Sequence, residues 1–244
     1  MTLLTEPTRI VLAMGQPVPN DPNFAFNSLL LHGNGTNGST VITDSSGSPK
    51  TVTAGGNAQI STAQSKFGGA SIAFDGAGDS LSAGISEDWT FLNDGTAFTV
   101  EAFVRGSVFS GSQVIASTIL NSASVGISLS VNSGNPLFRI ARGSSGSLAL
   151  NLQADTVLSV DTWHHLALVL TAEGLGAVYV NGTLDKSGTA SSLSLLRPSY
   201  PLSIGANPNI DLFFNGYIDD LRITKGVARY TANFTPPTAP FPDF

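Results

Sequence analysis

Two adjacent carboxylates, Asp219 and Asp220, are the residues best suited to chemistry in this sequence of 244 residues. They lie in an apolar stretch with the composition of a strand, in which neighbouring side chains point to opposite faces. One of the two must therefore face inward or lie at a kink. Because a buried carboxylate without a partner is costly, we expect it to meet a cation, backbone amides, or an arginine such as Arg222 or Arg105.

Other catalytic arrangements are poorly represented. Retaining glycoside hydrolysis needs two carboxyl groups about 5 Å apart, usually from one strand. The sequence has only four glutamates and no Glu-x-Asp-x-x-Glu run, and Glu101 stands alone on its expected strand. His164 and His165 are adjacent, so they face opposite ways on a strand, and His32 is distant in sequence, which gives no histidine metal site. With no Gly-x-Ser-x-Gly motif either, we expect the protein not to be an enzyme.

The composition bounds the class of protein. Only 11% of the residues are charged and 41% are hydrophobic, which suits a domain of many short strands and turns. The net charge of −6 argues against a nucleic-acid partner, and the absence of cysteine excludes disulfides. No stretch approaches the roughly 20 apolar residues of a membrane span, and no secretory signal is recognisable. We therefore expect no membrane span and synthesis in the cytoplasm.

Segment 98–105 shows the regular alternation of apolar and polar residues that is typical of a strand. Its apolar residues fall on one face, and Thr99, Glu101, Phe103 and Arg105 fall on the other. We expect this second face, polar except for one aromatic residue, to be solvated.

Further short strands are expected along the whole chain, at 28–31, 41–43, 51–54, 59–61, 71–74, 80–82, 113–120, 125–131, 137–141, 147–153, 165–171, 177–181 and 202–205. The pair Asn181 and Gly182 predicts a tight hairpin turn. Only residues 227–230 and 193–197 favour a helix. These patterns predict an all-β fold, a two-sheet antiparallel β-sandwich or jelly roll over residues 25–244. Residues 1–24 contain four prolines and predict an extended N-terminal arm.

Five segments resemble, in order, the laminin G-like domains of the concanavalin A-like lectin/glucanase superfamily. The clearest is residues 214–223, Phe-Asn-Gly-Tyr-Ile-Asp-Asp-Leu-Arg-Ile, which is similar to the closing strand of these domains. The others are residues 29–32 with 43–47, 66–76, 98–105, and 163–167 with 178–182. The resemblance implies a β-sandwich. It says little about function, because lectins, adhesins, hydrolases and virion proteins share this fold.

Calcium is the cofactor that the resemblance implies. Many members of the family hold this ion between the opening segment and the Ile-Asp-Asp strand, which points to Asp219, Asp220 and Asp44 as metal ligands. The chain departs from the family pattern at Gly33 and Asn34, where an amide replaces the expected carboxylate. The alternative is that Asp219 or Asp220 caps backbone amides and binds nothing.

A glycan-binding surface needs exposed aromatic side chains beside amides and carboxylates. Trp89, Phe213 and Tyr217 are the aromatic candidates, with Asn207 and Asp211 as their polar neighbours. The alternative for each aromatic residue is a place in the sandwich core.

The function we predict is that of a non-catalytic virion structural protein of a bacteriophage, built on a carbohydrate-binding fold. Residues 226–237 resemble segments of phage tail and capsid-associated proteins. Adhesion at a tail or fibre and decoration of the capsid are both consistent with this prediction, which places the chain in the virion. Expected partners are other virion proteins through the N-terminal arm, a host-surface glycan, and further copies of the chain. A free lectin or surface adhesin is the alternative, and a glycoside hydrolase is third.

Overall fold

The computed structural model describes residues 20–120, 124–142, 148–191, 200–209 and 211–244. Nearly all regular structure in these residues is strand, apart from two 3-10 helices, η1 (Phe24–Phe26) and η2 (Ser86–Asn93). The strands are β1 (Asn27–Leu31), β2 (Val52–Gly55), β3 (Gln59–Ser61), β4 (Ser71–Asp75), β5 (Ser80–Ala83), β6 (Phe98–Gly106), β7 (Ser112–Ser117), β8 (Val125–Asn132), β9 (Asn135–Arg142), β10 (Leu148–Gln153), β11 (His164–Leu170), β12 (Leu175–Val180), β13 (Thr183–Thr189), β14 (Leu202–Ile204) and β15 (Asn215–Lys225).

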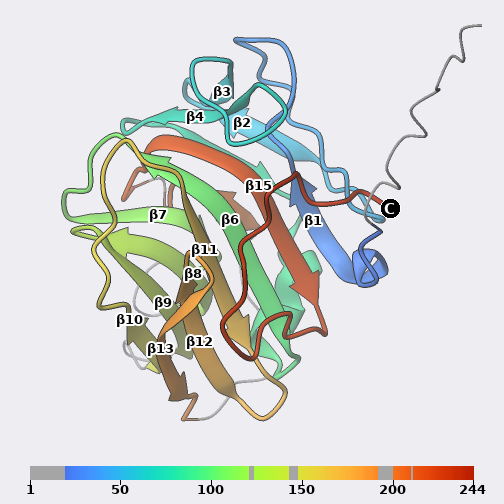
Figure 1. Ribbon diagram of the computed structural model, residues 1–244, viewed down its shortest axis with the longest axis vertical. Coiled ribbons are helices and arrows are strands. Elements are labelled where there is room, and N and C mark those ends of the chain that lie inside the picture. The colour runs from blue at the N-terminus through green and yellow to red at the C-terminus, as the bar shows by residue number, and fades with distance from the viewer. Residues whose placement is uncertain (1–19, 121–123, 143–147, 192–199, 210) are drawn as a thin grey trace, which may run out of the picture.

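The strands form two antiparallel sheets that pack face to face (Figure 1). Sheet A has the order β13-β12-β11-β6-β15-β4-β3, and β1 also pairs with β15. Sheet B has the order β10-β9-β8-β7-β14-β5-β2. This arrangement confirms the predicted all-β, two-sheet antiparallel sandwich.

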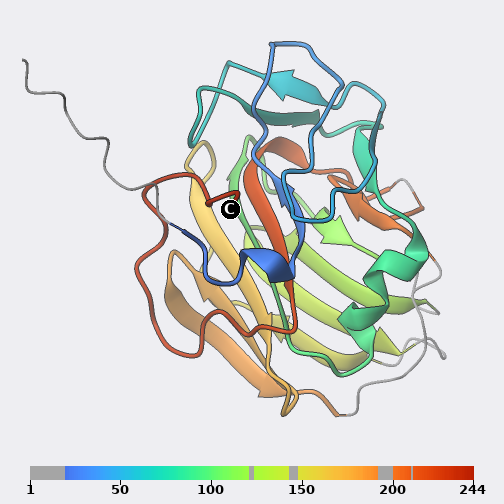
Figure 2. The ribbon, with the colours of Figure 1, turned by 90° about the vertical axis from the view of Figure 1, so that its right-hand side faces the viewer.

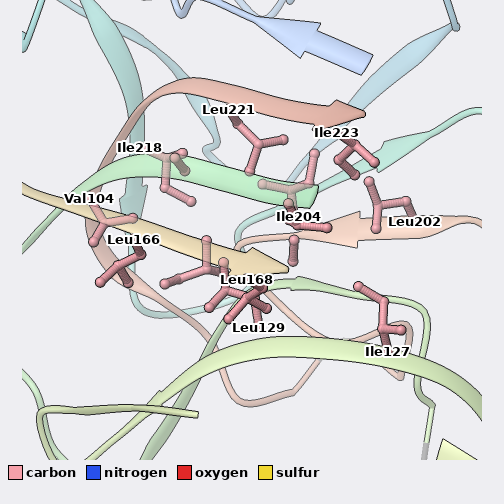
Figure 3. Close-up of a cluster of buried hydrophobic side chains, with 14 of the residues drawn as sticks. Val104, Ile127, Leu129, Leu166, Leu168, Leu202, Ile204, Ile218, Leu221 and Ile223 are labelled. Carbon is pink, nitrogen blue, oxygen red and sulfur yellow. The ribbon is translucent and has the colours of Figure 1, made fainter. Parts of the chain in front are cut away.

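The core lies between the two sheets (Figure 3). Alternate residues of each strand point inward, so Val104 and Leu166 of sheet A and Ile127 and Leu129 of sheet B belong to one buried cluster. Trp89, on η2, is also fully buried in this core. Burial of a large apolar side chain contributes about 1.5–3 kcal/mol, so this layer is the main source of stability.

A second apolar layer covers the outer face of sheet A. Residues 226–244, here called the C-terminal strap, cross that face after β15 (Figure 2). Tyr230 and Phe234 pack against Tyr179, while Phe241 packs against Phe103. The face of β6 that the sequence predicted to be solvated is therefore buried, with Phe103 only 2% exposed. That expectation was wrong because the alternation of a strand defines its two faces but not what covers them.

Several local predictions also need correction. Residues 41–43 form no strand, and residues 227–230 form no helix. β13 and η2 were not predicted, and segment 193–197 lies outside the described residues. The hairpin at Asn181 and Gly182 is confirmed, since it joins β12 to β13 with φ values of 49° and 78°.

The predicted arm falls mostly outside the described residues, which begin at Asn20. Its last residues reach the sandwich. Asp21 is buried, and its backbone amide donates to the carbonyl oxygen of Phe244 at 3.2 Å. The N-terminal segment and the end of the strap therefore lie side by side on sheet A.

Within the described part of the chain, no helix has the length and apolar character needed to cross a membrane.

Candidate functional site

The two adjacent carboxylates lie at a kink in β15. Asp220 has a positive φ of 46°, and the pairing of β15 with β6 shifts register between Asp219 and Arg222. Both carboxylates are buried, with exposed fractions of 0% and 1%. A kink was one of the two arrangements that the sequence allowed, and it lets both side chains lie inside the protein.

Asp220 joins the strap to the opening strand. One carboxylate oxygen contacts Nδ1 of His32, and the other accepts a hydrogen bond of 2.7 Å from the backbone amide of Phe241. Burial opposes a charge on His32, but the hydrogen bond and the charge of Asp220 raise its pKa above the ordinary value. Asp220 therefore has a structural role in holding the strap on the sheet.

Asp219 is less completely satisfied. Its Oδ2 accepts hydrogen bonds from the backbone amides of Lys66 at 2.7 Å and Phe67 at 3.1 Å, while its Oδ1 has no hydrogen-bond partner among the described residues. Burial, with the nearby charge of Asp220, raises the pKa of Asp219 to about 6. Ionisation of Asp219 therefore lowers the stability of the folded protein.

The third predicted metal ligand, Asp44, also accepts hydrogen bonds from backbone amides. Its Oδ1 accepts from the amides of Leu30 and Ser46, each at 2.9 Å, and its Oδ2 accepts from the amide of Lys50 at 2.6 Å. Calcium takes six to eight oxygen ligands, yet the described residues contain no group of three or more His, Cys, Asp or Glu able to hold a metal. Each of the three aspartates already accepts hydrogen bonds from backbone amides, and calcium binding by them stays an untested prediction.

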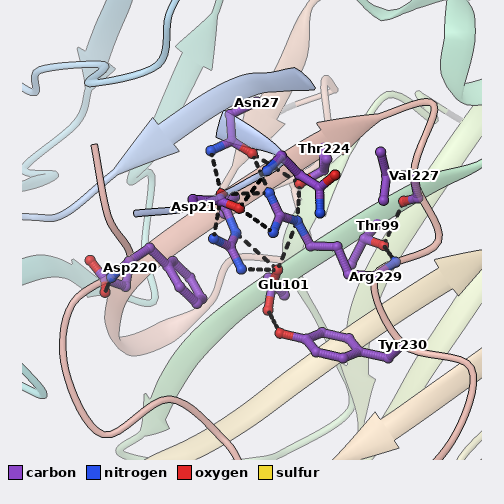
Figure 4. Close-up of polar contacts among 12 residues, drawn as sticks. Asp21, Asn27, Thr99, Glu101, Asp220, Thr224, Val227, Arg229 and Tyr230 are labelled. Atoms are coloured by element: carbon purple, nitrogen blue, oxygen red, sulfur yellow. Dashed lines mark hydrogen bonds and ion pairs between the residues drawn. The ribbon is translucent and has the colours of Figure 1, made fainter. Parts of the chain in front are cut away.

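A buried ionic network occupies the centre of the outer face of sheet A (Figure 4). Glu101 is fully buried, and its Oε1 accepts from Nη2 and Nε of Arg222 at 2.8 and 3.0 Å. Its Oε2 accepts from the hydroxyl of Tyr230 at 2.8 Å and lies 3.2 Å from Nε2 of His165. Burial opposes the charge, but Arg222 and these hydrogen bonds lower the pKa of Glu101 to about 2. Glu101 is therefore a fixed anion with no access to a substrate.

The same network extends to the N-terminal segment. Asp21 accepts hydrogen bonds from Arg222 at 3.2 Å and from both terminal nitrogens of Arg229 at 3.0 and 2.7 Å. Two carboxylates and two guanidinium groups thus balance one another under the strap. The network fastens both terminal segments to β6 and β15, which is a structural role.

The predicted glycan-binding residues do not form one surface. Trp89 is fully buried, and its Nε1 donates to the carbonyl oxygen of Ala83 at 2.9 Å, so its assignment to a sugar-stacking surface is incorrect. Asn207 is buried, and its side chain bonds the amide of Asp211 and the carbonyl oxygen of Leu120. These bonds show that the amide of Asn207 shapes its own loop.

The loop of Asn207 lies over sheet B and away from Tyr217. Asn207 lines an apolar hollow of about 280 Å³ together with Leu120, Leu148 and Leu212. Asp211 and Phe213 of the same loop are half-buried and do not line it. Tyr217 lies on sheet A, so the five predicted residues are divided between the core and the two sheets.

Tyr217 instead lines a polar hollow of about 430 Å³ on sheet A, to which the strap contributes no residue. The polar hollow is defined by its lining residues, Asn57, Gln59, Ala73, Phe74, Asp75, Asp79, Ser107, Asn215 and Tyr217. They come from β3, β4, β15 and adjoining turns. Tyr217 is half-buried, and the guanidinium carbon of Arg105 lies 5.9 Å from the centroid of its ring.

Hydrogen bonds fix the frame of the polar hollow. Asp79 is buried and accepts from the backbone amides of Asn57 and Asp75, the latter at 2.8 Å. Nδ2 of Asn215 donates to the carbonyl oxygen of Asp75 at 3.0 Å. Of these residues, only Tyr217 was predicted from the sequence. Gln59 and Asp75 could also have been found, because each is a polar residue next to an apolar one, Ile60 or Phe74, in an expected strand.

The architecture is that of a lectin-like fold. The sequence-family model of the concanavalin A-like lectin/glucanases superfamily matches residues 75–229, which is more than half of the chain. The chain therefore belongs to this superfamily, as its resemblance in sequence predicted. A comparison of the sequence with curated proteins gives no match.

Solved structures with the same fold include receptor-binding domains of toxins. The receptor-binding domain of a botulinum neurotoxin C/D mosaic serotype matches with a TM-score of 0.63 and 15% identity over 87% of this chain and 49% of that chain. The binding domain of Paraclostridial Mosquitocidal Protein 1 matches with a TM-score of 0.62 and 16% identity, over 83% and 49% of the two chains.

A third structure concerns botulinum neurotoxin type C, whose cell entry is described as dependent upon interaction with two ganglioside molecules. It matches with a TM-score of 0.63 and 13% identity, over 83% of this chain and 48% of that chain. At these identities the similarity shows the fold alone, and the chain spans about half the length of these structures.

Proposed function

We propose that this protein is a non-catalytic carbohydrate-binding domain that holds a glycan in the polar hollow of sheet A. The observation that carries the proposal is that Tyr217, which is only partly buried, lines a hollow together with amide and carboxylate side chains. An aromatic ring offers an apolar face to the C–H groups of a sugar ring, and amides and carboxylates bind its hydroxyl groups. The volume of about 430 Å³ falls within the roughly 300–1,000 Å³ usual for small-molecule sites.

The carboxylates of the polar hollow support binding without hydrolysis. Retaining and inverting glycosidases use two carboxyl groups that both reach the sugar. Asp75 is exposed, but Asp79 is buried and both of its oxygens accept backbone amides. Glu101, on the neighbouring strand, is locked by Arg222 and Tyr230. The described residues of the hollow thus provide one free carboxylate, which argues for a binding role.

The toxin structures lend further support to a glycan ligand. One of them is described as interacting with two ganglioside molecules, which carry sugars. That property belongs to the toxin, and this chain shares with it only the fold. The fold nevertheless is compatible with presenting a sugar-binding surface.

The test is a glycan array probed with the wild-type protein and with Tyr217→Ala. We expect binding by the wild type and a loss of at least tenfold in affinity for the variant, because the stacking face is removed. Phe26→Ala is the matched control, since Phe26 is an aromatic residue that is 51% exposed and lies outside the polar hollow. Equal losses in both variants, or wild-type affinity in Tyr217→Ala, would refute binding at this hollow.

Within this function, we propose a more specific role as a structural protein of a bacteriophage virion, in tail or fibre adhesion or capsid decoration. The proposal rests on the resemblance of residues 226–237 to phage virion proteins. The side-by-side position of Asp21 and Phe244 supports it, because partners that bind the two terminal segments would meet one region of the domain. Imaging whole particles at side-chain resolution tests it. Copies at fixed symmetric positions are expected, whereas absence from particles would leave a free lectin or adhesin.

A further inference from the structure

The charges around the polar hollow bear on the kind of sugar it takes. We propose, resting on the glycan-binding function above, that the polar hollow prefers sugars with a protonated amino group, accepts neutral sugars, and rejects acidic ones. Asp75 is the residue to which we assign this preference. The proposal concerns specificity and does not require any catalytic step.

The lining of the polar hollow is acidic. Among its described residues, Asp75 and Asp79 carry negative charge, and no lysine, arginine or histidine is present. An acidic sugar would bring a further carboxylate beside these two groups without a cation to receive it. Like charges held together in a partly enclosed site repel, so acidic sugars are disfavoured.

The nearest arginine does not reverse this balance. Arg105 lies over the ring of Tyr217, but its Nη1 binds a carboxylate oxygen of Asp161 at 2.9 Å. Its charge is thus already paired outside the polar hollow. The guanidinium group therefore supports the ring of Tyr217 while leaving the negative charge of the lining in place.

Asp75 and Asp79 differ in what they can offer a ligand. Asp79 is 1% exposed, and backbone amides occupy both of its oxygens. Asp75 is exposed, with Oδ1 accepting from the amide of Ala77 at 2.7 Å and Oδ2 making only a long contact of 3.4 Å with Nδ2 of Asn57. Asp75 can therefore accept a hydrogen bond from a ligand, and the buried Asp79 adds a second negative charge close to it.

An ammonium group is the donor that would benefit most from this arrangement. An ammonium group adds Coulomb attraction to Asp75 and Asp79 that a hydroxyl or acetamido donor lacks, so an amino sugar at Oδ2 of Asp75 gains affinity over neutral sugars. We expect up to about a fivefold higher affinity for the amino sugar, because an exposed ion pair contributes at most about 1 kcal/mol.

The experiment compares three probes of equal length: short oligomers of glucosamine, of N-acetylglucosamine, and of galacturonic acid. Titration calorimetry at about pH 6 keeps ordinary aspartates ionised, because their usual pKa is about 3.9. Asp75→Asn keeps the shape of the side chain and its acceptor for Ala77. Asp94→Asn is the matched control, because exposed Asp94 makes the same turn contact, accepting the amide of Thr96 at 2.9 Å.

Both variants reduce the net charge equally, so attraction of a cationic oligomer to an acidic protein affects them alike. We expect Asp75→Asn to lose up to about fivefold in affinity for the glucosamine oligomer and little for the N-acetylated one, with Asp94→Asn behaving as the wild type. Equal effects in the two variants, or equal binding of the acidic and neutral oligomers, would overturn the proposed preference. In that result the neutral oligomer still binds and the glycan-binding function stands, whereas failure of all sugars to bind would remove both proposals.

Discussion

Replacement of Asp219 by asparagine should stabilise the protein at neutral pH and have much less effect in acid. Asp219 is fully buried, and its Oδ1 has no hydrogen-bond partner among the described residues. Its pKa is raised from the ordinary 3.8 to about 6. The folded protein therefore favours the neutral form of this side chain, which asparagine resembles in shape and charge.

The sign and size follow from linkage between proton binding and folding. Since the folded pKa is above the unfolded one, the stabilising effect of protonation is complete below about pH 3.8 and is lost as the pH rises through about 6. At 1.36 kcal/mol for each pH unit, the difference between about 6 and 3.8 corresponds to about 3 kcal/mol. Above pH 6 the wild type carries this cost, and Asp219→Asn does not.

Urea unfolding followed by tryptophan fluorescence measures the effect, because Trp89 is buried and Trp163 is half-buried. The quantity to compare is the change in unfolding free energy between about pH 3 and about pH 8, on either side of the interval in which Asp219 titrates. A new amide group that lacks a partner would cost the same at both pH values and so cancels.

We expect the variant to gain up to about 3 kcal/mol relative to the wild type over this interval. Asp94→Asn serves as the control, because it removes an equal charge from an exposed turn. A stability difference between Asp219→Asn and the wild type that stays constant with pH would refute the reasoning. The same pH dependence in Asp94→Asn would assign the effect to net charge.

Two further predictions concern the outer face of sheet A. Arg222→Met should lower the unfolding free energy by about 3–5 kcal/mol, because Glu101 and Asp21 would lose a buried cation. Chemical denaturation measures this loss, and a change below about 1 kcal/mol would contradict the prediction. Addition of a calcium chelator should leave the Tm unchanged, because Asp44, Asp219 and Asp220 already accept hydrogen bonds from backbone amides. A fall in Tm that added calcium reverses would instead support calcium binding.

The sequence was sufficient to predict the sandwich because its strands alternate regularly. On β6, the inward and outward residues follow the predicted alternation, and the turn at Asn181 and Gly182 joins two strands as expected. Strand β13 was missed because its pattern of exposure is irregular, as suits an edge strand with Leu184 largely in water. Local patterns therefore predict strands that alternate regularly and miss a strand, such as β13, that does not.

The candidate site was harder to predict because exposure depends on distant segments. Trp89 and Tyr217 are both aromatic residues close to acidic ones in sequence, yet one is in the core and the other lines the polar hollow. Asp75 and Asn215 are far apart in sequence and meet only because β4 pairs with β15. No pattern within a single segment contains that pairing.

The course of the strap explains why the polar hollow lies where it does. On the outer face of sheet A, Phe103 and Tyr179 give the strap an apolar surface to cover. Towards β3 and β4 the outward residues include Gln59 and Asp75, which would lose hydrogen bonds to water if they were covered. The same alternation of side chains thus decides which part of the sheet the strap covers and which part, at Tyr217, it leaves open.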